Sequence, residues 1–81
     1  MDLKKTARKM QRGLAAKGVR VRINQYQHFS AEKNRFSVKY VVEKEEKKGE
    51  RRYKTILKTY RMVDVVKLLA KLLEDADGDA E

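Results

Sequence analysis

Residues 35–43 (Arg-Phe-Ser-Val-Lys-Tyr-Val-Val-Glu) are the clearest structural signal in the chain, because apolar and polar side chains alternate along them. One phase contains Phe36, Val38, Tyr40 and Val42. The other contains Arg35, Ser37, Lys39 and Glu43. A period of two, with β-branched and aromatic residues, is typical of a strand that is buried on one face. Strand-like runs flank the segment on both sides, so we predict that it is the middle strand of a sheet.

The flanking runs are residues 19–29 and 51–60, and they alternate in the same way. The first places Val19, Val21, Ile23 and Phe29 in one phase. The second places Tyr53, Thr55, Leu57 and Thr59 in one phase, but its alternation is weaker. A slip of one residue would exchange the two faces of this third strand. Gly49 is expected to supply the positive φ at the tip of the hairpin between the second and third strands.

A helical pattern occupies each end of the chain. Leu3, Ala7, Met10 and Leu14 recur at helical spacing, with Asp2 as the expected N-cap and Gly18 as the expected stop. Residues 62–76 carry an apolar arc of roughly 220°. One sheet face does not need so wide an arc, so either the first helix packs beside it or a second subunit covers the excess.

These patterns predict an α+β fold: a single small α-β-β-β-α domain over residues 1–76. We expect a three-stranded antiparallel meander with both helices packed on one face. The face beneath the helices is predicted to contain Val19, Val21, Ile23, Phe36, Val38, Tyr40, Val42, Tyr53 and Leu57. Residues 77–81 are short and acidic, and they are expected to form a disordered tail.

Charge is the strongest feature of the composition. The 81 residues carry a net charge of +9. Five of the 12 acidic residues lie in residues 74–81, so the first 73 residues carry 21 basic and 7 acidic side chains. Such an excess favours a polyanionic partner. The chain has no Cys, no signal-peptide pattern and no apolar run of the ~20 residues that span a bilayer, so we expect a soluble, cytoplasmic protein.

The basic residues gather on two predicted surfaces, the open face of the sheet and one face of the first helix. We expect phosphate contacts from the sheet residues Arg20, Arg22, Arg35, Lys39, Arg52, Lys54 and Lys58. On the first helix the corresponding residues are Lys5, Arg8 and Arg12. Tyr26 and Tyr60 are candidates for stacking on a base, and Asn24 is a candidate base contact. We expect all three strands to offer charge of only one sign on this face.

The predicted order of elements resembles that of the double-stranded-RNA-binding domain. Residues 34–42 are similar to the middle strand of that family. The family's second helix begins with a Gly-rich, Ser-Lys-Lys-type cluster, whereas this chain has Tyr-Arg-Met-Val-Asp at residues 60–64. The resemblance is therefore one of topology over residues 3–75, and it implies no site residues. DNA-binding modules in which a three-stranded meander, backed by a helix, enters the major groove fit the basic face at least as well.

The sequence shows no catalytic, cofactor or metal motif. There is one His and no Cys, and no Gly-rich phosphate loop is present. We therefore expect a non-enzymatic module that binds nucleic acid, with DNA slightly favoured over RNA and with little sequence specificity. The alternative is a protein–protein adaptor or inhibitor of the type found on phages and mobile elements. Such a protein would bind a host protein, or form a homodimer through the second helix.

Overall fold

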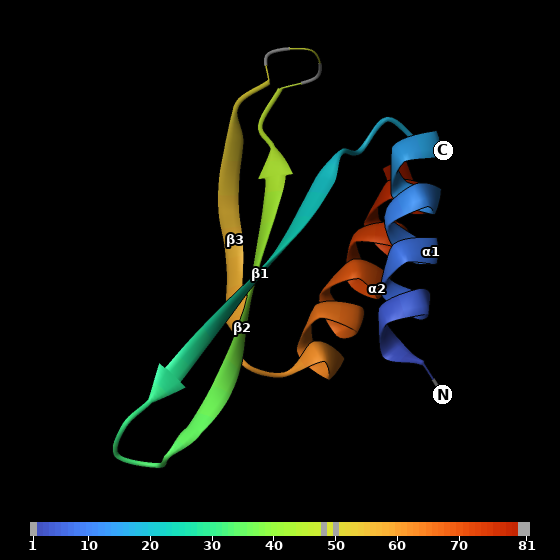
Figure 1. Cartoon of the computed structure of the whole chain (residues 1–81). Helices are drawn as coiled ribbons and strands as arrows, with labels where there is room; N and C mark the ends of the chain where they lie inside the picture. The colour runs from blue at the N-terminus through green and yellow to red at the C-terminus, as the bar shows by residue number, and fades with distance from the viewer. Residues whose placement is uncertain (1, 48, 50, 80–81) are drawn as a thin grey trace.

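The chain folds into two helices and a three-stranded sheet in the order α-β-β-β-α (Figure 1). The computed structural model describes residues 2–47, 49 and 51–79, without the side chains of 77–79. The elements are α1 (Leu3–Ala16), β1 (Val21–Ser30), β2 (Arg35–Glu45), β3 (Tyr53–Thr59) and α2 (Met62–Asp79). The predicted α+β class, element order and single small domain are confirmed.

The boundaries of α1 follow from the residues that cap it. The Asp2 carboxylate accepts hydrogen bonds from the backbone N–H groups of Lys4 and Lys5, at 3.0 and 3.3 Å. These bonds satisfy donors that the first helical turn leaves unpaired. At the other end Gly18 has a φ of 85°, and its N–H donates to the Ala15 carbonyl at 3.0 Å. Both predicted ends of this helix are confirmed.

The sheet is an antiparallel meander with strand order β1-β2-β3. β1 pairs with β2 along its whole length, whereas β3 pairs only with the segment of β2 from Tyr40 to Glu45. The β1–β2 hairpin therefore extends past the end of β3 (Figure 1). At the tip of the second hairpin Gly49 has the predicted positive φ, at 87°.

A β-bulge changes which faces the residues of β3 occupy. Val42 pairs with Leu57, but the next residue of β2, Glu43, pairs with Thr55, so Ile56 is the extra residue. Ile56 and Leu57 both pack against the core. The bulge exchanges the faces of the preceding residues. The predicted positions of Tyr53 under the helices and of Lys54 on the open face are therefore wrong.

Both helices cover the same face of the sheet, and α1 packs along α2 (Figure 1). The core between these layers contains Ala7, Leu14, Val21, Tyr40, Val42, Val65 and Leu69. No exposed large hydrophobic side chain lies on the described part of α2. The first helix and the sheet thus cover the wide apolar arc of α2, which was one of the two predicted explanations for it. Pairing with a second subunit stays a prediction.

The helices leave the far end of the β1–β2 hairpin uncovered. β3 ends opposite Tyr40, and the Thr59 hydroxyl donates to the Asp64 carboxylate at 2.6 Å, which fixes the turn into α2. Both helices consequently lie beside the other half of the sheet (Figure 1). Phe29 and Phe36 are 49% and 64% exposed, with ring centroids 5.1 Å apart. The prediction that helices pack onto Phe36 is wrong.

The second helix is longer than predicted, because it extends to Asp79 instead of ending at residue 76. No Pro interrupts the helical hydrogen bonding there, and Gly78 weakens a helix without stopping it. The last two residues of the predicted tail, 80 and 81, lie outside the described residues. Within the described chain, neither helix combines the length and the apolar composition needed to cross a membrane.

Gly13 lies inside α1 where the helix approaches α2, and a Cβ added there would lie 3.6 Å from Leu73 Cδ2. That distance is an ordinary van der Waals contact. We expect Gly13→Ala to raise the free energy of unfolding by about 0.5–1 kcal/mol, because alanine has the higher helix propensity. Urea unfolding measures the change. Gly18→Ala is the contrasting variant, since its positive φ should make the same substitution destabilising. A lower midpoint for Gly13→Ala would contradict the expectation.

Candidate nucleic-acid interface

A groove of about 590 Å³ lies between α1 and the beginning of β1. It is lined by Arg8, Gln11, Arg12, Ala15, Arg20, Val21 and Tyr53, and we call it the helix groove. Three of the seven lining residues are arginines, and none of these described residues is acidic. The groove thus brings together basic residues from both surfaces that the sequence predicted, the first helix and the sheet.

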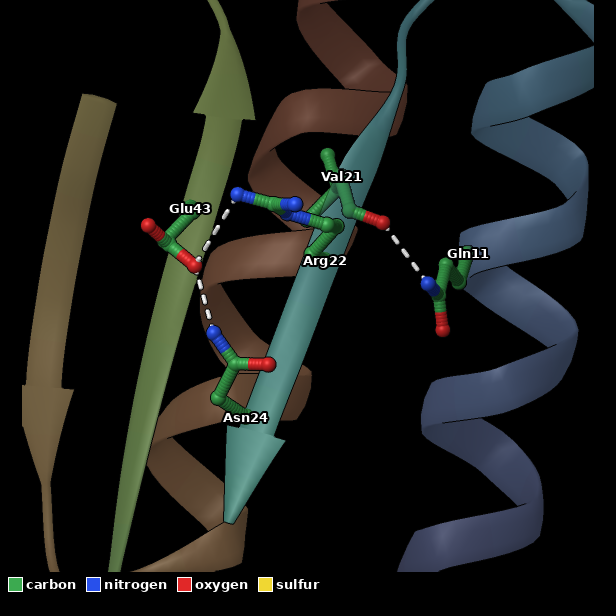
Figure 2. Close-up of polar contacts among 5 residues, drawn as sticks. All are labelled: Gln11, Val21, Arg22, Asn24 and Glu43. Carbon is green, nitrogen blue, oxygen red and sulfur yellow. Dashed lines mark hydrogen bonds and ion pairs between the residues drawn. The ribbon is translucent and has the colours of Figure 1, made fainter. Parts of the chain in front are cut away.

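The positions of the three arginines follow from helix geometry and strand pairing. Arg8 and Arg12 are four residues apart on α1, so they lie on the same face of the helix. Gln11 lies beside them, and its side-chain amide donates to the Val21 carbonyl at 2.7 Å (Figure 2). This bond ties α1 to β1. Arg20 directly precedes β1, and its carbonyl accepts from the N–H of Glu45 at 3.0 Å.

Arg22, which was predicted to contact phosphate, already has two partners within the protein. Its guanidinium carbon lies 3.7 Å from the centroid of the Tyr53 ring. Its Nη2 lies 3.5 Å from Glu43 Oε1, the same oxygen that accepts a hydrogen bond from the Asn24 amide (Figure 2). Glu43 therefore holds both Arg22 and Asn24, although the Arg22 side chain remains 52% exposed.

The open face of the sheet is less uniformly charged than predicted. Glu43 pairs with Arg22 across the strands and so shares its face. Glu45 follows on the same face, opposite Tyr53, and is only 8% exposed. Its carboxylate accepts from the Gly49 N–H at 3.2 Å. The expectation of one sign of charge on this face is wrong, because the middle strand contributes two carboxylates at its C-terminal end.

The other end of the open face keeps its basic character. Tyr26 lies opposite Lys39 in the strand register, and Lys58 lies opposite Val41. A second hollow, of about 540 Å³, lies towards the end of the hairpin, and we call it the hairpin hollow. It is lined by His28, Ser30, Lys33, Arg35, Phe36, Ser37, Val38 and Tyr60. Arg35 and Tyr60, both predicted site residues, are thereby brought together.

Eight of the thirteen predicted residues line neither hollow, namely Arg22, Asn24, Tyr26, Lys39 and Lys58, described above, and Lys54, Lys5 and Arg52. Lys54 pairs with Lys44 and thus shares the face of Val21, on the helix side of the sheet. Lys5 is exposed on α1, and Arg52 is exposed just before β3. Gln11 and Lys33 line the two hollows but were not predicted as contacts. Gln11 lies three residues after Arg8 on the basic helix, and this spacing could have predicted that it shares the face of Arg8.

Comparisons with protein-family models, with curated proteins and with solved structures give no match. Within the described residues, no three His, Cys, Asp or Glu side chains gather in a way that could hold a metal ion. Among the described residues, the two hollows are where the predicted basic and aromatic side chains meet.

Proposed function

We propose that this protein is a small, non-catalytic nucleic-acid-binding module that holds the phosphate backbone in the helix groove. One observation carries the proposal: Arg8, Arg12 and Arg20 line one groove, and none of its described lining residues is acidic. Guanidinium groups present a fork of N–H donors that matches phosphate oxygens and stays charged at any physiological pH. Three of them on one groove supply affinity for a polyanion.

The remaining contacts extend from this groove in two directions. Lys4, Lys5 and Lys9 are exposed along α1, and Lys39 and Lys58 lie on the open face of the sheet. Contacts of this kind position a nucleic acid without reading its sequence. Asn24 was the candidate for a base contact, but its amide bonds to Glu43. We therefore propose weak sequence specificity. DNA is proposed to be slightly favoured over RNA.

A salt titration tests the proposal. Fluorescence anisotropy with labelled duplex DNA, duplex RNA and single strands should show log affinity falling linearly with log salt, by about 0.9 per phosphate contact on B-form DNA and about 0.7 on single strands. Three arginine contacts alone predict a slope of magnitude roughly 2 to 3. The tightest ligand identifies the type of nucleic acid. Absence of binding to all of them at low salt would contradict the proposal.

The alternative proposal is an adaptor or inhibitor that binds a protein. The exposed Phe29–Phe36 pair is the observation that favours it, since exposed aromatic side chains are enriched where proteins associate. Light scattering at two concentrations would detect a homodimer. A monomer that binds no nucleic acid would favour a heteromeric protein partner, and the basic groove would then be the docking surface for acidic side chains of that partner.

A further inference from the structure

The exposed aromatic side chains are concentrated at one end of the molecule. Four large hydrophobic side chains are exposed within the described chain, namely Tyr26, Phe29, Phe36 and Tyr60. All four are aromatic, and none is aliphatic. Three of them belong to the β1–β2 hairpin, and the fourth, Tyr60, lines the hairpin hollow together with Phe36. Phe36 and Tyr60 are also the two most exposed, at 64% each.

The strand pairing explains why this end of the molecule is open. β3 ends opposite Tyr40, so residues 35–39 of β2 have β1 as a neighbour on one side and no paired strand on the other side in the described chain. The hairpin hollow lies along this part of β2. Tyr60 reaches it from the turn that leads into α2, and Lys33 reaches it from the turn between β1 and β2.

The side chains around the rings are those that suit an anionic ligand. Lys33 and Arg35 add two positive charges to the hollow, and no acidic residue is among its described lining residues. His28, Ser30 and Ser37 add groups that can form hydrogen bonds. Aromatic side chains beside a positively charged surface are the combination that binds single-stranded nucleic acids, because successive bases stack on the rings while cations follow the backbone.

We propose that the hairpin hollow binds unpaired nucleotides of a single strand, with bases stacked on Phe36 and Tyr60 and with phosphates held by Lys33 and Arg35. A base inside a duplex has both faces covered by its neighbours, whereas an unpaired base can offer its faces to these rings. The inference rests on the proposed nucleic-acid function, and it specifies the class of ligand. Binding in the helix groove needs only phosphates, whereas binding in the hairpin hollow needs bases.

The two sites lie far enough apart to act on separate parts of one strand. Arg20 precedes β1, and His28 and Ser30 lie at its other end. Eight to ten residues of strand separate them, which corresponds to roughly 30 Å at ~3.3 Å per residue. An oligonucleotide of about 16 nucleotides, the upper end of the site sizes of single-strand-binding domains, is therefore a suitable probe.

The test compares two labelled single strands of equal length and charge, a thymidine oligonucleotide and an abasic strand that keeps the sugars and phosphates. Stacking predicts that the protein binds the thymidine strand more tightly, by roughly 5- to 150-fold for each base that stacks. The slopes of log affinity against log salt should be the same for both strands. The Phe36→Ala/Tyr60→Ala variant should lose this preference and bind both strands as the unsubstituted protein binds the abasic one. Gln25→Ala/Gln27→Ala is the matched control, because it changes two exposed side chains of the same hairpin without removing a ring.

The outcomes separate this inference from the proposed function. Equal affinity for the two strands, with a steep dependence on salt, would overturn the hairpin site and leave the helix groove in place. A Phe36→Ala/Tyr60→Ala variant that keeps the preference would overturn it as well, since the bases would then stack elsewhere. No binding to either single strand would overturn the hairpin site, and the titrations with duplex DNA and duplex RNA would then decide whether the helix groove binds nucleic acid. The comparison of strands uses the unsubstituted chain, so its result does not depend on how any variant folds.

Discussion

Replacing Arg8, Arg12 and Arg20 together by glutamine should lower the affinity for nucleic acid by roughly 100- to 500-fold at 0.1 M salt. Each phosphate contact raises the logarithm of the affinity by about 0.9 for every tenfold decrease in salt concentration. Three contacts therefore raise it by roughly two to three units when the salt concentration falls from 1 M to 0.1 M. The slope of log affinity against log salt should become shallower by about 2 to 3. Anisotropy titrations of the variant and of the unsubstituted protein, on the same labelled strand, measure both quantities.

The matched control replaces Lys47, Lys67 and Lys71 by glutamine. These lysines are exposed, and none of them lines the helix groove. The control variant therefore loses the same three positive charges as the arginine variant, but outside the groove. We expect a much smaller loss of affinity. If the control variant loses as much affinity as the arginine variant, the net charge of the molecule and not the groove would account for binding.

Leu14→Ala should lower the free energy of unfolding by about 2–5 kcal/mol. Leu14 is fully buried in the core, where α1 meets α2 and the sheet, and the shorter side chain would leave a cavity there. A domain of 81 residues has a total stability of only about 4–12 kcal/mol, so this single change would remove a large part of it.

Urea unfolding followed by circular dichroism measures the loss. Leu3→Ala makes the same change near the beginning of the same helix, at a half-buried position outside the core cluster, so its effect should be clearly smaller. Similar midpoints for the two variants would mean that the contact between α1 and α2 contributes little to stability.

The periodicity of the sequence was enough to predict the elements of this fold. Alternating side chains located the middle strand, and Asp2 and Gly18 located both ends of α1, because capping depends on residues that are adjacent in the chain. The faces of β3 could not be predicted in the same way. The bulge at Ile56 depends on pairing with β2, and it exchanges the positions of Tyr53 and Lys54 without any signal in the local pattern.

The candidate site was predictable as a set of basic residues but not as a geometry. Arg8, Arg12 and Arg20 were each identified by their charge, but their meeting in one groove depends on the packing of α1 beside β1. The partners of Arg22 could not be predicted from the sequence, for a similar reason. Only the strand register places Glu43 opposite Arg22. The guanidinium group that was predicted to contact phosphate is therefore already paired with a carboxylate of the protein.

The helix groove also depends on contacts between elements that lie far apart in the sequence. β1, β2 and β3 pair with their neighbours along the sequence, so the meander can form as the chain emerges from the ribosome. α1 packs mainly against α2, which is made last of the five elements. A helix of 14 residues is only marginally stable alone in water. The arginines of α1 therefore reach their final positions only when α2 packs against that helix, so the groove requires a contact between the first and the last of the five elements.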